Sequence, residues 1–219
     1  MSSPSCQRIL IVDDHPMMRE GLRTLISRER DLIVCGEAET AGQALDAVAN
    51  LKPDLVLVDI TLPGPTGIEL IKNVRALQHA ILILVISMHD ESLYAERVLR
   101  AGARGFIMKQ ESGPTMMQAI RQVLAGRIYV SDKMSARILE NVASNRTEAS
   151  PIERLSDREW EVFQLIGRGK STVQIAEELH LSPKTVETHR ARVKEKLDLR
   201  TMNELISFAS RWVETQDAR

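Results

Sequence analysis

The stretch Leu55-Val56-Leu57-Val58-Asp59 decides the fold, because an apolar run of strand length ends there in a single carboxylate. An uninterrupted apolar run of this length is typical of a strand buried on both faces of a parallel sheet. The carboxylate at its end loses hydration unless a partner compensates for it. The stretch therefore predicts a buried parallel sheet that carries a charged group at the carboxyl end of one strand.

Other apolar runs end in polar side chains in the same way. The residues that follow the apolar segments 9–12, 81–86 and 105–108 are Asp13 with Asp14, Ser87 and Lys109. The carboxyl ends of parallel strands meet at one edge of a sheet, where ligands of such folds bind. One edge therefore collects three carboxylates, a hydroxyl and an ammonium group. This set suits an aspartate nucleophile that accepts a phosphoryl group with Mg²⁺.

The composition indicates a globular protein of one large or two small domains. The chain has 219 residues, of which 43% are hydrophobic and 27% charged, and its net charge is −1. No global charge excess points to nucleic acid or to a membrane. The start of the chain lacks the apolar core of a signal peptide, and Cys6 and Cys35 lack metal-binding spacing. We expect a cytoplasmic protein that does not bind membranes.

Strand and helix patterns alternate from residue 8 to residue 125. Strands are expected at 8–12, 32–37, 54–58, 81–86 and 105–108, and helices at about 16–29, 40–50, 66–77, 91–101 and 113–125. This rhythm implies an α/β fold with a doubly wound, flavodoxin-like, five-stranded parallel sheet of order 2-1-3-4-5. The ligand crevice of that order lies between the first and third strands, which carry Asp13, Asp14 and Asp59.

The pattern changes after Gly126. One more helix is expected at 131–143, followed by a polar, aperiodic linker at 143–151 and four short helices at about 157–167, 172–179, 183–197 and 202–214. Capping-box pairs mark three of these helix starts: Ser156 with Glu159, Ser171 with Gln174, and Thr201 with Glu204. We expect a domain at 1–127, a linker with a helix at 128–152, and a small all-α domain of four helices at 153–219.

The carboxylates at the sheet edge predict a cation site. Clustered carboxylates raise each other's pKa unless a cation is present, and Mg²⁺ is usually held by one or two carboxylates, a carbonyl and waters. The predicted ligands are Asp13, Asp14, Asp59 and the backbone carbonyl of Thr61. Lys109 would offset the charge of an incoming phosphate. A single aspartate after a strand is usually a helix cap, but that explanation does not extend to the whole set.

Residues 8–125 resemble a response-regulator receiver domain. The matching segments are Ile11-Val12-Asp13-Asp14-His15-Pro16, Asp59-Ile60-Thr61-Leu62-Pro63 with Gly67, Ser87, and Phe106-Ile107-Met108-Lys109. The resemblance implies that Asp59 takes phosphate from a sensor histidine kinase and that Asp13, Asp14 and Asp59 hold Mg²⁺. It also implies that Ser87 moves toward the phosphate while Phe106 turns inward as a switch. Thr61 and His89, each two residues beyond a site residue, should flank the phosphoryl group and set its half-life.

The segment 175–186 indicates a helix, a short turn and a second helix. Val186, Val193 and Leu197 line one face of the second helix, and the opposite face carries Lys184, Glu187, Thr188, Ala191 and Arg192. Such a helix can enter the major groove of DNA. Residues 184–200 hold six Lys/Arg against three Asp/Glu, which is only a local excess. DNA affinity is therefore expected to depend on dimerisation.

The segments Leu155-Ser156-Asp157-Arg158-Glu159 and Leu181-Ser182-Pro183-Lys184-Thr185-Val186-Glu187-Thr188-His189-Arg190 resemble a LuxR-type helix-turn-helix. The whole chain resembles a NarL/FixJ-type response regulator, a transcription factor that binds promoter DNA and forms a homodimer on phosphorylation. The resemblance implies base contacts from Glu187, Thr188 and Ala191, and phosphate contacts or packing from Lys184, His189, Arg190 and Arg192. Thr185 and Lys194 are also expected to contact DNA. Ala191 stands where several relatives carry a longer polar side chain.

Three other functions compete with this one. A haloacid-dehalogenase-type phosphatase needs an acid two residues after its nucleophile, where this chain has Thr61, so we do not expect an enzyme. A P-loop at Gly169-Lys170-Ser171 lacks the required glycine, since Gln164 occupies its place. A protein-interaction module stays open, as does the choice between release of the recognition helix and dimerisation through helices 1 and 5 or 4 and 5.

Overall fold

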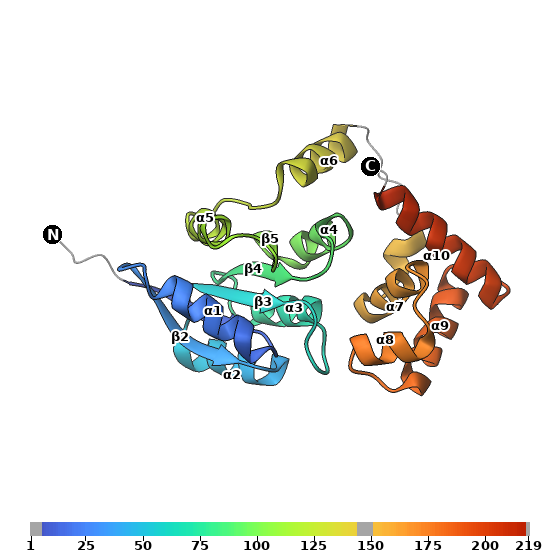
Figure 1. Ribbon diagram of the computed structural model, residues 1–219, viewed down its shortest axis with the longest axis horizontal. Coiled ribbons are helices and arrows are strands. Elements are labelled where there is room, and N and C mark those ends of the chain that lie inside the picture. Colours follow the sequence, from blue (N-terminus) through green and yellow to red (C-terminus); the bar gives the residue numbers. More distant parts are fainter. Residues whose placement is uncertain (1–5, 144–150, 218–219) are drawn as a thin grey trace. The chain divides into compact units, whose positions relative to one another are not determined.

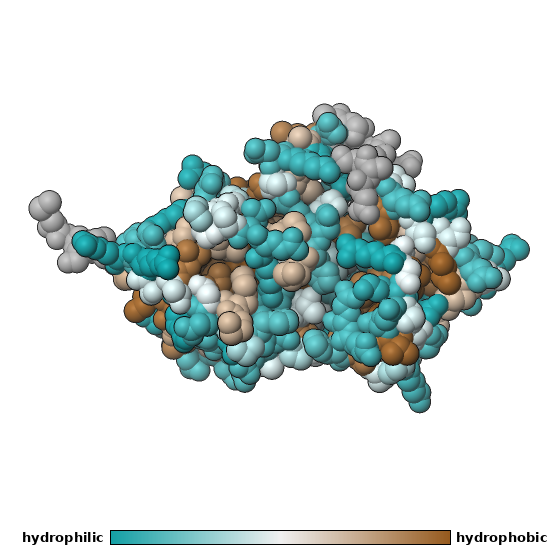
Figure 2. Space-filling view, viewed as in Figure 1, coloured by the Kyte–Doolittle hydropathy of each residue, from teal (hydrophilic) through white to brown (hydrophobic). Residues whose placement is uncertain are grey.

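The computed structural model describes residues 6–143 and 151–217 of the chain. The chain divides into two compact units, Met1–Glu140 and Asn141–Arg219, and each is described by itself (Figure 1). Within the described residues, no helix combines the length and the apolar character needed to span a bilayer. Polar side chains cover most of the face seen in Figure 2, with apolar atoms between them.

The first unit is built on the predicted sheet. Its strands are β1 (Gln7–Val12), β2 (Leu32–Ala38), β3 (Leu55–Asp59), β4 (Leu82–Ser87) and β5 (Gly105–Met108). Neighbouring strands are all parallel and lie in the order β2-β1-β3-β4-β5, which confirms the predicted topology. The register sets Val12 beside Val58 and Asp59 beside Ile86. The carboxyl ends of the three central strands therefore meet at one edge.

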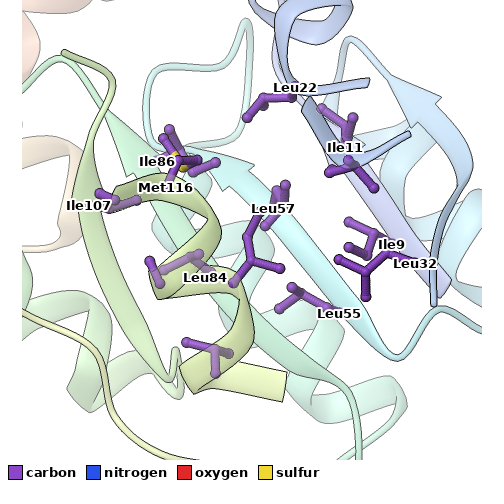
Figure 3. Packing of buried hydrophobic residues seen from close by; sticks show 14 residues of the cluster. Ile9, Ile11, Leu22, Leu32, Leu55, Leu57, Leu84, Ile86, Ile107 and Met116 are labelled. Carbon is purple, nitrogen blue, oxygen red and sulfur yellow. The ribbon is translucent and has the colours of Figure 1, made fainter. Parts of the chain in front are cut away.

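Helices cover both faces of this sheet. They are α1 (Pro16–Ile26), α2 (Ala41–Leu51), α3 (Gly67–Leu77), α4 (Glu91–Ala101) and α5 (Gly113–Leu124). The helices α1 and α5 pack on one face, where Leu22 and Met116 meet the strand residues Ile11, Leu57 and Ile86 (Figure 3). The helices α2, α3 and α4 lie side by side along the other face (Figure 1). Full burial of each such aliphatic side chain is worth about 1.5–3 kcal/mol, so the strands form a rigid frame for the residues at their ends.

Gly67 allows α3 to begin close to the end of β3. A β-carbon at this position would lie 2.3 Å from the backbone oxygen of Asp59 and 2.6 Å from the Cα of Ile60. The Gly67 N–H donates to the oxygen of Ile60 at 2.9 Å. Thr66 and Glu69 form a capping box that starts the helix at this point. The backbone next to Asp59 is therefore held from two sides.

The segment after α5 extends the sheet beyond β5. Tyr129 pairs with Gly105 in a parallel bridge: its N–H donates to the Arg104 oxygen at 3.0 Å, and its oxygen accepts from Phe106 N at 2.9 Å. Ser131 N donates to the Glu91 carboxylate of α4 at 2.8 Å. The helix α6 (Asp132–Ala143) follows. The compact first unit runs to Glu140, so most of α6 lies within it.

The described part of the second unit is all-helical, as predicted. It contains the short 3₁₀ turn η1 (Pro151–Arg154) and the helices α7 (Asp157–Gly167), α8 (Thr172–Glu178), α9 (Pro183–Lys196) and α10 (Met202–Asp217). Phe163 of α7 contacts the rings of Phe208 and Trp212 of α10, with centroids 5.9 and 5.8 Å away. The capping boxes that begin at Ser156 and Ser171 are complete. At the third predicted box, the Glu204 carboxylate accepts from Arg200 N instead of from Thr201 N.

Candidate functional sites

The first candidate site is the acidic pocket at the carboxyl edge of the sheet. Asp13 and Asp59 are 2% and 3% exposed, and the Nζ of Lys109 lies 2.7 Å from an oxygen of each. These three side chains come from the ends of β1, β3 and β5. Asp14 lies beside them and is partly buried. The structure thus brings together the carboxylates and the ammonium group that the sequence predicted to meet.

The pocket holds more negative charge than Lys109 can neutralise. Burial raises the pKa of Asp59 from its ordinary 3.8 to about 6; Lys109 lowers it, and the neighbouring charge of Asp13 raises it further. Burial alone would lower the pKa of Lys109, but the carboxylates of Asp59 and Asp13 raise it above its ordinary value. One ammonium group therefore faces three carboxylates in a poorly hydrated place, which favours binding of an additional cation.

The donor atoms fit a divalent cation. Ligand atoms of Asp13, Asp14, His15 and Asp59 all lie within 4.8 Å of one another. Hard divalent cations prefer such carboxylate oxygens. The Thr61 backbone N–H donates to Asp59 Oδ1 at 3.2 Å, which turns the segment after β3 toward the carboxylate.

Ser87, Thr61 and His89 are joined beside the pocket. Ser87 is fully buried, and its hydroxyl accepts from the backbone N–H of His89 at 3.0 Å. The Thr61 hydroxyl and the His89 Nε2 lie 2.9 Å apart, so the segments after β3 and β4 are bridged. The His89 ring also stacks on Tyr94 with a centroid distance of 4.9 Å. The two residues predicted to flank a phosphoryl group thus contact each other.

Phe106 is fully buried in β5 and lines a cavity of about 290 Å³ between α4, β5 and α6. Tyr129 and Met134 line the same cavity. Burial raises the pKa of Tyr129, and the negative charges of Glu111 and Glu91 raise it further. The predicted switch residue therefore lies next to the segment that leads into α6.

Sequence reasoning did not identify two side chains that touch the pocket. The Nδ1 of His15 lies 2.7 Å from Asp14 Oδ1 and 3.2 Å from Asp13 Oδ1. Arg19 of α1 donates from Nη1 to the backbone oxygen of Asp13 at 2.7 Å and is itself held by Glu37 and Glu39. The position of His15 directly after the aspartates was a usable signal. No comparable signal marked Arg19 in the sequence, because its carboxylate partners belong to the segment around β2.

The second candidate site is the outer surface of α9. Val186 and Val193 are fully buried, which fixes the orientation of the helix. The predicted outer-face residues are exposed, and they are Lys184, Glu187, Thr188, Ala191 and Arg192. Ser182 caps the helix by accepting from Thr185 N at 3.1 Å, and Pro183 begins it.

Four other residues that were predicted to contact DNA make contacts within the second unit instead. Arg190 is 14% exposed and bonds to the Thr172 hydroxyl of α8 and, at 3.1 Å, to Glu187. His189 is half-buried, and burial together with the positive charge of Arg158 lowers its pKa. The Thr185 and Ser182 hydroxyls lie 2.8 Å apart, and Lys194 Nζ donates to the Arg200 oxygen at 3.5 Å. In this conformation, Arg190 and His189 pack α9 against its neighbours.

A partly buried ion pair holds α7 against α9. Lys196 Nζ lies 2.6 Å from the Glu159 carboxylate, whose side chain is 4% exposed. Burial alone would raise the pKa of Glu159, but hydrogen bonds from Lys196 and Ser156 outweigh it and lower the pKa. The same carboxylate completes the capping box of α7. The end of the outward-facing helix is thereby fixed to the rest of the unit.

Two protein families match the chain, one in each unit. Residues 9–121 match the response regulator receiver domain, and residues 153–209 match the bacterial regulatory proteins of the luxR family. A putative transcriptional regulator of Pseudomonas aeruginosa is 38% identical over 93% of this chain and 97% of its own length. The response regulator GacA of the same species is 34% identical over 93% of this chain and 95% of its own length.

Solved structures of response regulators are also similar to this chain. A two-component response regulator of the LuxR family from Aurantimonas sp. is 40% identical, with a TM-score of 0.59, over 64% of this chain and 99% of its own. RcsB from Salmonella enterica serovar Typhimurium, bound to promoter rprA with the phosphomimetic BeF₃⁻, is 25% identical. Its TM-score is 0.61, over 93% of this chain and 98% of its own.

Proposed function

This chain belongs to the response regulators that join a receiver domain to a luxR-family DNA-binding domain, and we propose that Asp59 is its phosphoacceptor. The observation that carries the proposal is the position of Lys109 Nζ, 2.7 Å from both Asp59 and Asp13. A positive charge at this distance from Asp59 supports the proposal, because it would attract the oxygens of a phosphoryl group on that residue. A sensor histidine kinase is the proposed donor.

The chemistry follows from the buried carboxylate. The ionised Asp59 oxygen attacks phosphorus as the bond from phosphorus to the kinase's imidazole nitrogen breaks. Asp13, Asp14, Asp59 and the Thr61 carbonyl would hold Mg²⁺, which when bound would offset the negative charge of the carboxylates and of the phosphoryl oxygens. Lys109 would hold one phosphoryl oxygen, and the Ser87 hydroxyl would turn from His89 N toward another.

We propose that Ser87 and Phe106 pass this change to α6. Ser87 and Glu91 lie four residues apart, and the Glu91 carboxylate accepts from Ser131 N at 2.8 Å. Phe106 N donates to the Tyr129 oxygen at 2.9 Å. A shift of the β4–α4 segment would therefore strain or break the bonds that hold the start of α6. Release of α6 would change the length of free chain before the second unit.

The output is transcriptional regulation at promoter DNA. The exposed face of α9, with Glu187, Thr188 and Ala191 at its centre, is the proposed base-reading surface. Lys184 and Arg192 would bind phosphates. Because the local charge excess is small, a homodimer on two half-sites would supply the missing affinity. We place this activity in the cytoplasm and propose no hydrolase activity, because Thr61 supplies no carboxylate to activate water.

Intact-mass measurement after incubation with acetyl phosphate and Mg²⁺ tests the proposal. The unmodified chain should gain one phosphoryl group, and Asp59→Asn should gain none. Asp46→Asn, an exposed aspartate on α2, is the matched control and should be phosphorylated normally. Gel-shift titrations with promoter DNA would then compare the DNA affinities of the phosphorylated and the unphosphorylated chain. Phosphorylation that persists in Asp59→Asn would refute the assignment of the acceptor.

A further inference from the structure

His15 lies against the acidic pocket, although the predicted ligand set does not include it. Its Nδ1 is 2.7 Å from Asp14 Oδ1 and 3.2 Å from Asp13 Oδ1. Its backbone N–H donates to Asp13 Oδ1 at 2.9 Å, which holds the residue beside that carboxylate. The side chain is 64% exposed, so ions in solution can reach the ring.

These separations match those between ligands of one metal ion. Two ligands at right angles, each about 2.1 Å from an octahedral ion, lie about 3 Å apart. The two distances from His15 Nδ1, 2.7 and 3.2 Å, lie on either side of that value. Ligand atoms of Asp13, Asp14, His15 and Asp59 lie within 4.8 Å of one another, close to the roughly 4.2 Å between opposite ligands of such an ion. Small movements would bring all four atoms to one cation.

The presence of a nitrogen atom changes which cations the pocket favours. Mg²⁺ prefers oxygen ligands, whereas imidazole nitrogen suits first-row transition metals. We propose that His15 is a selectivity residue whose Nδ1 gives the pocket an additional affinity for a transition-metal ion that favours imidazole, such as Co²⁺ or Ni²⁺. With its proton on Nε2, the ring offers the Nδ1 lone pair to the ion. This inference rests on the proposed cation site of Asp13, Asp14 and Asp59.

A purely orienting role for His15 makes a different prediction. If the ring only hydrogen-bonds to Asp13 and Asp14, its removal disturbs the carboxylates. The pocket then loses affinity for every divalent cation to a similar extent. If Nδ1 is a ligand, removal weakens transition-metal binding and largely spares Mg²⁺. The ratio of the two affinities therefore separates ligation from orientation. The fold should tolerate the substitution His15→Asn, because His15 precedes the first residue of α1 and asparagine is favoured at that capping position.

Titration calorimetry of the full chain, prepared without a histidine tag, would compare Mg²⁺ with Co²⁺. His15→Asn should weaken Co²⁺ binding by at least about tenfold, the lower end of the loss seen for groups that merely support a metal ligand. Mg²⁺ binding should change by less than about twofold, because the oxygen ligands remain. The matched control is His79→Asn, an exposed histidine in the α3–β4 segment, which should change neither affinity.

Pulsed EPR of Mn²⁺ bound to the unmodified chain gives a second readout. Coupling to one directly bound nitrogen is expected, and it should disappear in His15→Asn. An unchanged ratio of Co²⁺ to Mg²⁺ affinity, or Mn²⁺ without nitrogen coupling, would overturn the inference and leave Asp59 phosphorylation intact. Failure of Mg²⁺ to bind the unmodified chain would instead overturn the proposed cation site, and this inference with it.

Discussion

Neutralising Asp59 should stabilise the first unit in the absence of metal. Its pKa is raised from 3.8 to about 6, chiefly by burial. Because the folded carboxyl binds its proton more tightly than the unfolded one, ionised Asp59 destabilises the fold above pH 6, and this cost fades as the pH falls toward 4. At 1.36 kcal/mol per pKa unit, the cost at pH 7.5 is about 3 kcal/mol. Asp59→Asn removes it.

Scanning calorimetry of the full chain in EDTA would measure the effect. For a unit of this size, a stabilisation of about 3 kcal/mol raises the midpoint temperature of thermal unfolding by roughly 6–12 °C. The gain should be present at pH 7.5 and small at pH 4. Asp46→Asn, at an exposed site, should shift the midpoint by much less. Tryptophan fluorescence identifies the other transition, because both tryptophans, Trp160 and Trp212, lie in the second unit.

Addition of Mg²⁺ should cancel most of this difference in stability. A ligand at a hundred times its Kd stabilises the folded state by about 2.7 kcal/mol. Mg²⁺ should stabilise the unmodified chain more than Asp59→Asn, because the variant lacks one proposed carboxylate ligand. A lower midpoint for Asp59→Asn in EDTA at pH 7.5 would refute the reasoning. It would mean that the ion pair with Lys109 contributes more to stability than the burial of Asp59 costs.

Three further substitutions test other parts of the structure. Gly67→Ala should destabilise the first unit by about 1–3 kcal/mol in calorimetry, since the added methyl collides with the backbone of Asp59 and Ile60. Lys196→Met should destabilise the second unit by about 1–3 kcal/mol in urea titrations followed by tryptophan fluorescence, because it leaves the buried Glu159 carboxylate without its ammonium partner; no loss would mean that the ion pair does not contribute to stability. Arg192→Ala should reduce the slope of log K against log salt for DNA binding by about one, whereas Arg190→Ala should mainly lower stability.

The sequence predicted most of the fold because the fold depends on repeating patterns. Apolar runs of strand length, separated by helical periods, imply parallel strands, and right-handed crossovers leave few possible strand orders. The residues at strand ends followed from the same reasoning, and the structure brings Asp13, Asp59 and Lys109 within hydrogen-bonding distance. A site built from strand ends can therefore be predicted without coordinates.

Contacts made by single side chains across distant segments were not predictable. Arg19 donates to the Asp13 backbone while Glu37 and Glu39 hold its guanidinium from the segment around β2. Tyr129 extends the sheet, although the run of three strand-favouring residues around it, 128–130, is too short to predict a strand. On α9, the helical period predicted which residues face outward. It did not predict that Thr172 of α8 binds Arg190.

The size of the switching energy argues that Ser87 cannot act alone. A charge-assisted hydrogen bond is worth about 1.5–3 kcal/mol, whereas moving a two-state equilibrium from 1:99 to 99:1 needs about 5.5 kcal/mol. Ser87 must also give up its bond to His89 N, at 3.0 Å, to reach a phosphoryl oxygen. We expect Lys109, which already binds two carboxylates, to supply part of the energy by exchanging one of them for the phosphate. On this argument, Lys109→Arg should uncouple phosphorylation from the change at Glu91 and Ser131 even where Asp59 is fully modified.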